Sequence, residues 1–107
     1  MRITHLGHAC LLVEIADRRI LIDPGAFAGD FLALRDVDAI LVTHQHPDHL
    51  DPVRLPELVR ALGDVPLWCD PQSVSVLSGL GIEANGHDGQ VVSVGEVEIQ
   101  PVGEMHA

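Results

Sequence analysis

Short apolar runs alternate with turn residues along the first quarter of the chain, a pattern typical of β-strands. Residues 2–6, 9–15 and 19–23 are predicted strands, with Gly7-His8 and Asp17-Arg18 as the breaks between them. Because these connections are short, we expect the three strands to pair as antiparallel hairpins.

A continuous apolar segment at residues 38–43 predicts a strand that is buried on both faces. Alternating helices and strands follow it. We expect a helix that Asp51-Pro52 begins and Gly63 ends, a strand at 66–69, a helix at 70–80, a turn at 85–90 and two strands within 91–102. The pattern predicts an α/β fold: a mixed β-sheet with helices on one face.

A polar segment rich in metal-ligand side chains follows the buried strand. In an extended chain, residues two apart point to the same side, so His44 and His46 can hold one cation. Pro47 bends the chain and can turn Asp48 and His49 toward a neighbouring position. Imidazole suits Zn, Fe, Ni or Cu, and carboxylate adds a harder oxygen. The alternative is a polar loop that caps the next helix, but this density of ligands favours metal binding.

Composition and charge limit the classes of partner that the chain is expected to bind. The chain has 107 residues, which suits one small domain, and a formal net charge of −10. Its six basic residues are all Arg, so nucleic acid and anionic membranes are disfavoured. No apolar run approaches the ~18 residues of a membrane span, and no signal peptide is apparent. We expect a cytoplasmic protein whose Cys10 and Cys69 are reduced and buried.

Several segments resemble the metallo-β-lactamase fold hydrolases. Residues 43–49, Thr-His-Gln-His-Pro-Asp-His, are similar to that family's metal-binding signature. Residues 22–25 resemble its earlier aspartate motif, and residues 103–106 its next histidine motif. The opening, residues 3–10, is similar to the branch that contains ascorbate-6-phosphate lactonase. The resemblance implies an αββα sandwich of two similar halves, of which residues 1–107 form the N-terminal half.

The resemblance also implies a ligand set. His44, His46 and His106 would bind the first metal, and Asp48 and His49 the second. The family has a later bridging aspartate and a later histidine, which would come from the second half of the fold or from a partner chain. A homo-oligomer is left open.

Two further residues are expected near the metals. The resemblance gives Asp23 the role of hydrogen-bonding the ligands and shaping its loop. His8, at a strand break, is a candidate for the floor of the site, and a plain turn residue is the alternative.

The implied function is metal-dependent hydrolysis of a small-molecule ester, lactone or phosphate ester. Two divalent metals, Zn first and Mn or Fe as alternatives, would generate a metal-bound hydroxide that Asp48 orients. Alternatives are a nuclease-type phosphodiesterase of the same fold, a mononuclear iron oxygenase and a non-catalytic metal-binding or regulatory module.

Other polar side chains are assigned structural roles. His5 lies in a strand, and His87 in a predicted tight turn. Arg54 and Arg60 are expected on a solvated helix face, with an anion clamp as the alternative. The apolar strand at residues 40–42 needs packing partners on both faces of the sheet. We therefore expect the 107-residue chain alone to expose an apolar sheet face. We also expect it to lack activity.

Overall fold

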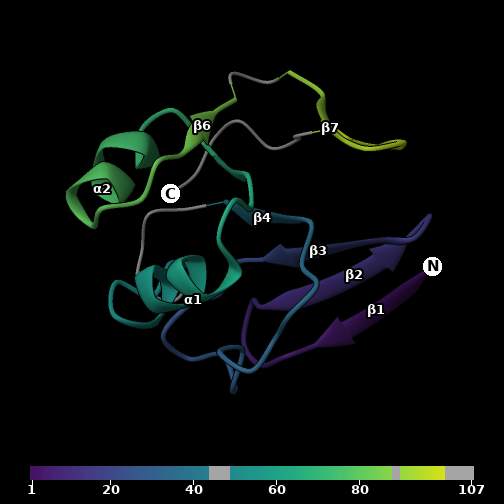
Figure 1. Cartoon of the computed structure of the whole chain (residues 1–107), viewed down its shortest axis with the longest axis horizontal. Coiled ribbons are helices and arrows are strands. Elements are labelled where there is room, and N and C mark those ends of the chain that lie inside the picture. Colours follow the sequence, from purple (N-terminus) through teal and green to yellow (C-terminus); the bar gives the residue numbers. More distant parts are fainter. Residues whose placement is uncertain (44–48, 88–89, 101–107) are drawn as a thin grey trace.

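The computed structural model describes residues 1–43, 49–87 and 90–100, and its sheet begins with an antiparallel meander. The meander comprises β1 (Arg2–His5), β2 (Leu11–Ile15) and β3 (Arg18–Ile22) (Figure 1). The first break is wider than predicted. Leu6 N donates to the Cys10 carbonyl and Cys10 N donates to that of Gly7, so β2 begins at Leu11 and not at residue 9.

The second part of the sheet is parallel. It comprises β4 (Ala39–Val42), β5 (Leu67–Cys69) and β6 (Asn85–Gly86), joined through α1 (Arg54–Leu62) and α2 (Ser73–Gly79). The strand order β1-β2-β3-β4-β5-β6 confirms the predicted mixed sheet. The predicted turn at 85–90 is wrong at its start, because the backbone of Asn85 and Gly86 pairs with β5. Backbone pairing of so short an edge strand needs no apolar side chain.

Both helices pack on one face of the sheet, as predicted. Leu21, Ile40 and Leu67 are partners in adjacent strands and therefore point to the same face. Leu55 and Leu58 of α1 join them in the main core, as does Leu77 of α2. All six side chains are at most 1% exposed.

The opposite face is covered in part by a hairpin of β7 (Val92–Val94) and β8 (Val97–Ile99). Val92, Val94 and Val97 pack with Ile20 and Ala39, and Leu41 and Trp68 lie against this second cluster. The expectation that this face lacks cover is therefore wrong for the centre of the sheet. The apolar side chains of the β7–β8 hairpin supply that cover. Toward β1, Ile3 remains 56% exposed.

Asp51 organises the start of α1. Its Oδ1 accepts the backbone N–H groups of Val53 (2.8 Å) and Arg54 (3.0 Å), so the carboxylate caps this end as predicted. The predicted start at Asp51-Pro52 is too early, however, because α1 begins at Arg54. Pro56 falls in the first helical turn, where a missing N–H group costs little. The Asp51 N–H donates to the Pro24 carbonyl, so the same residue ties the helix start to the loop after β3.

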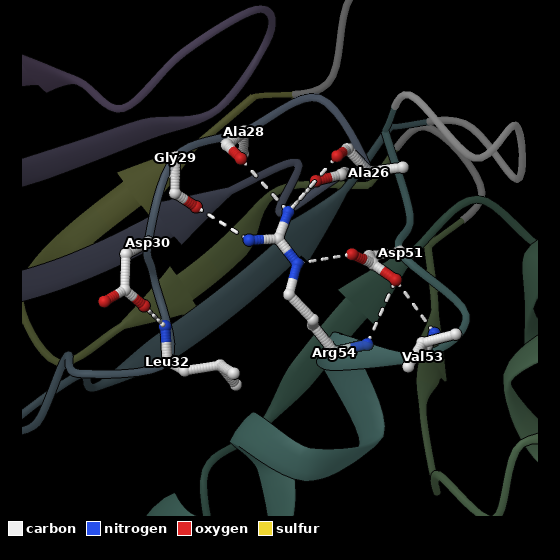
Figure 2. Close-up of polar contacts among 9 residues, drawn as sticks. Ala26, Ala28, Gly29, Asp30, Leu32, Asp51, Val53 and Arg54 are labelled. Carbon is white, nitrogen blue, oxygen red and sulfur yellow. Dashed lines mark hydrogen bonds and ion pairs between the residues drawn. The ribbon is translucent and has the colours of Figure 1, made fainter.

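Arg54 extends this tie along the loop (Figure 2). Its Nε donates to Asp51 Oδ2 at 2.6 Å, and its Nη1 donates to the Gly29 carbonyl at 2.9 Å. Its Nη2 lies within 3.0–3.3 Å of three further loop carbonyls, those of Gly25, Ala26 and Ala28. Neither expectation for Arg54 was right: the guanidinium binds backbone carbonyls of its own chain, a use that the planar fork of five donors allows.

Asp51 is charged because of these donors. Burial alone would raise the pKa of its carboxyl group, but the Arg54 side chain and the backbone N–H groups of Arg54 and Val53 outweigh that effect. Its pKa therefore lies below the ordinary value, and the ion pair with Arg54 persists at neutral pH. The Arg54 guanidinium also lies 4.4 Å from the centroid of the Phe31 ring, a favourable cation–π contact.

The two cysteines lie in the main core, as predicted. Both are fully buried and form no disulfide. Burial raises the pKa of each thiol to about 11, with Asp23 adding to the rise at Cys10 and Asp70 at Cys69. Within the described part of the chain, no helix is long and apolar enough to cross a membrane.

Replacing Arg54 should test how much its bonds to the loop contribute. Arg54→Ala leaves Asp51 without its ion-pair partner and the loop carbonyls without their donor, so the free energy of unfolding should fall by about 3 kcal/mol. Urea denaturation followed by circular dichroism measures this loss. Arg60→Ala, on an exposed position of the same helix, is the matched control and should leave stability unchanged. Equal effects in the two variants would contradict the role given to Arg54.

The cysteines should react slowly with thiol reagents in the native protein. At pH 8 a pKa of about 11 leaves only on the order of one thiolate per thousand thiols, and the core also blocks access. Titration with a chromogenic disulfide should therefore be at least roughly a hundredfold slower in buffer than in denaturant. Fast labelling of either cysteine in the native state would show that its strand opens readily.

Candidate functional site

The candidate site lies at the carboxyl ends of β3 and β4. Asp23 follows β3 directly, and Thr43 follows β4. These two strands are parallel neighbours, so the residues that follow them meet at one edge of the sheet. In open α/β sheets, this edge is where ligands bind.

Asp23 is a buried carboxylate that accepts three hydrogen bonds from the described residues. Its Oδ1 accepts the Thr43 backbone N–H at 2.6 Å, and its Oδ2 accepts the Thr43 hydroxyl at 2.6 Å. The same Oδ2 lies 2.8 Å from His49 Nδ1. Asp23 is only 4% exposed, so these donors replace the water that the charge would otherwise bind.

The backbone of Asp23 has an uncommon conformation. Its φ of 51° is in the left-handed region, where aspartate is more common than most non-glycine residues. The Asp23 N–H still donates to the Leu41 carbonyl at 2.8 Å, and the Asp23 carbonyl accepts from Gly25. Strained residues held by their surroundings are frequent at functional sites.

One carboxylate therefore holds both ends of the predicted metal-binding segment. Thr43 precedes residues 44–48 and His49 follows them, and both side chains bind Asp23. This arrangement fixes where the segment leaves the sheet and where it returns.

The bond to Asp23 also sets the tautomer of His49. A carboxylate can only accept, so Nδ1 of His49 carries the proton. In the neutral ring, Nε2 then presents its lone pair. A histidine oriented in this way by a carboxylate is the common arrangement of metal-binding histidines, so the Asp23–His49 pair fits a metal ligand.

His8 lies beside His49. The two ring centroids are 6.3 Å apart in an edge-to-face arrangement. His8 has a φ of 51°, and its carbonyl accepts a 2.6 Å hydrogen bond from Nε2 of His5. The ring of Phe27 also packs edge-to-face against the ring of His8, with the two centroids 5.5 Å apart. His8 is thus next to one predicted ligand, and His5 supports the turn that holds it.

The other predicted site residues lie outside the described residues. These are His44, His46, Asp48 and His106, so their metal-binding and catalytic roles remain predictions. Within residues 1–43, 49–87 and 90–100, no group of three or more His, Cys, Asp or Glu side chains is placed to hold a metal ion. Of the predicted ligands, His49 lies within the described residues, and it is hydrogen-bonded to Asp23.

Sequence reasoning missed two contributions. Thr43 was part of the motif but had no role, although its spacing after the buried strand could have suggested a partner for Asp23. Phe27 received no role at all. The available signal was an aromatic residue in a loop rich in Gly and Ala, which the core does not explain.

Comparison with known proteins identifies the family of this chain. Residues 2–107 match the Beta-lactamase superfamily domain. The chain is 40% identical over its whole length to protein Rv0786c of Mycobacterium tuberculosis, of which it covers 50%. It is 36% identical over 104 residues to a UPF0173 metal-dependent hydrolase of Xanthobacter autotrophicus, covering 89% of this chain and 41% of that protein.

A solved structure supports the fold. Igni18, a metallo hydrolase from Ignicoccus hospitalis, superposes with a TM-score of 0.65 at 24% identity, covering 86% of this chain and 42% of Igni18. The chain spans about half the length of the curated relatives described above. The match over nearly all of its residues is decisive for the family: this chain belongs to the Beta-lactamase superfamily.

Proposed function

We propose that this chain carries the metal-binding part of a hydrolase that acts on a small ester, lactone or phosphate ester. The observation that carries the proposal is the buried Asp23 carboxylate, which bonds Thr43 and His49 at the two ends of the metal-ligand segment. Superfamily membership and the UPF0173 metal-dependent hydrolase among the relatives support it.

In this proposal two divalent cations bind at the carboxyl ends of β3 and β4. His44, His46 and His106 hold the first, and Asp48 and His49 hold the second. Zinc is the first candidate because imidazole and carboxylate ligands suit it, and Mn or Fe are alternatives. The tautomer of His49 is consistent with this ligand role, since its Nδ1–H is held by Asp23.

The chemistry divides between metals and side chains. Bound divalent cations supply Lewis acidity, which lowers the pKa of a water molecule and stabilises negative charge that develops on the substrate. Asp48 orients the attacking water and accepts hydrogen bonds from it. Asp23 keeps the proton on His49 Nδ1 and holds the ring in place. No serine or cysteine nucleophile is needed, which agrees with the burial and raised thiol pKa values of Cys10 and Cys69.

The decisive experiment combines metal analysis with turnover of the complete natural protein, including any further residues or partner chain. Asp48→Asn keeps the shape of the side chain but removes its charge, so hydrolysis of generic ester and phosphodiester substrates should fall by several orders of magnitude. Asp64→Asn, an exposed position between α1 and β5, makes the same chemical change away from the site. It should leave turnover unchanged. Metal binding without turnover on any of these substrates would overturn the hydrolase proposal.

Asp23 should control metal affinity through His49. Asp23→Asn replaces the acceptor of the His49 Nδ1 proton with a group that can also donate, so the preferred tautomer and ring position are lost. Metal affinity should fall by roughly 10- to 100-fold, measured by competition with a chromogenic chelator. Asp38→Asn is the matched control, because Asp38 also accepts a backbone N–H, that of Arg19, but lies at the opposite end of β4. Unchanged affinity in Asp23→Asn would contradict the role given to this carboxylate.

A further inference from the structure

Phe27 is a large apolar side chain that the fold does not bury. It is 70% exposed, whereas Phe31, four residues later, is fully buried in the main core. Exposed Val, Ile and Met side chains occur elsewhere among the described residues, but Phe27 is the aromatic member of that group. An exposed aromatic ring offers a large apolar surface for contact with a ligand.

Phe27 lies beside the candidate site. Its ring contacts that of His8, with centroids 5.5 Å apart, and the ring of His8 lies next to that of His49. His49 in turn is bonded to Asp23. A continuous row of side chains thus leads from the buried carboxylate at the sheet edge to an exposed aromatic ring.

The loop that carries Phe27 is held on both sides. Ala28 N donates to the Gly25 carbonyl, which closes a turn around Phe27. Arg54 binds the carbonyls of Gly25, Ala26, Ala28 and Gly29 (Figure 2). The opposite side of the loop packs on residues 6–7: Gly29 N donates to the Leu6 carbonyl, and a Cβ on Gly7 would lie 3.1 Å from Gly29 N. Phe27 is therefore presented on a rigid support, which lowers the entropy cost of using it as a contact.

We propose that Phe27 is a substrate-contacting residue that selects substrates with an apolar acyl or alkyl group next to the scissile bond. The inference rests on the proposed hydrolase function and adds the substrate class. Contact between this ring and an apolar group of the substrate removes surface of both from water. The rings of His8 and His49 connect Phe27 to the proposed metal site, so the contact lies close to the proposed reaction centre.

The experiment compares chain-length selectivity in the complete natural protein loaded with metal. Two series vary one side of the ester at a time: methyl acetate, butyrate and hexanoate, and then methyl, butyl and hexyl acetate. In the wild type, kcat/KM should rise with chain length in one series. Phe27→Ala should lower kcat/KM for the longest member of that series by roughly tenfold while changing methyl acetate less than about twofold.

Two further variants separate contact from structure. Phe27→Leu keeps an apolar side chain and should retain part of the selectivity. Val76→Ala truncates an exposed apolar side chain on α2, away from this row, and should change nothing. A Phe27→Ala variant that lowers all substrates equally, or none, would overturn the proposal. A uniform loss is what a merely structural role predicts.

A binding measurement keeps this inference separate from the proposed function. If the wild type hydrolyses no member of either series, the ester proposal fails, and calorimetry with acetate, hexanoate and hexanol still tests Phe27. Tighter binding of hexanoate or hexanol than of acetate in the wild type, reduced roughly tenfold in Phe27→Ala, supports the apolar contact. Equal binding in both proteins overturns it.

Discussion

The buried carboxylate of Asp23 is the interaction on which the site depends. It sits where β3 ends, with a left-handed backbone and almost no solvent exposure. Such a charge is stable only if donors surround it, and the donors come from Thr43 and His49. The need to satisfy one buried charge therefore brings the end of β4 and His49, the last residue of the metal-ligand segment, to the same point.

A second ion pair, between Asp51 and Arg54, also holds the loop that follows Asp23. Asp51 and Arg54 lie just after His49 in the chain, and together they bind the backbone of the loop that follows Asp23. Asp23 and the Asp51–Arg54 pair thus join the same two stretches of chain, 23–29 and 49–54, at different points. Removing either connection would leave the other to hold both stretches, so their effects on stability should be coupled and not additive.

The strands and helices could be predicted because their signals are local. Alternating apolar residues predict β1–β3, and Asp51 with Pro52 predicts a helix close to where α1 begins, at Arg54. The contacts of Arg54 could not be predicted, since its partners lie 25 to 29 residues away and are backbone carbonyls, which every residue type carries. β6 was missed for a related reason: its pairing with β5 is made by backbone groups, which no apolar pattern signals.

The candidate site, too, could be predicted only in part. Asp23, His8 and His49 could be named from motifs, but their mutual contacts arise from strand order, which a motif does not encode.

The use of arginine bears on the substrate. The chain has six arginines and no lysine against 16 acidic residues. Arg54 is engaged with Asp51 and the loop, Arg35 donates to the Leu32 and Leu34 carbonyls, and Arg18 pairs with Asp38. Half of the positive charge is thus committed within the fold. A phosphate backbone binds through many cations arranged along a surface, whereas the small substrate proposed above would need few charged contacts beyond the proposed metals. This distribution of charge disfavours a nucleic acid as the partner of the described residues, and it agrees with the proposal that a small substrate is selected in part through apolar contact with Phe27.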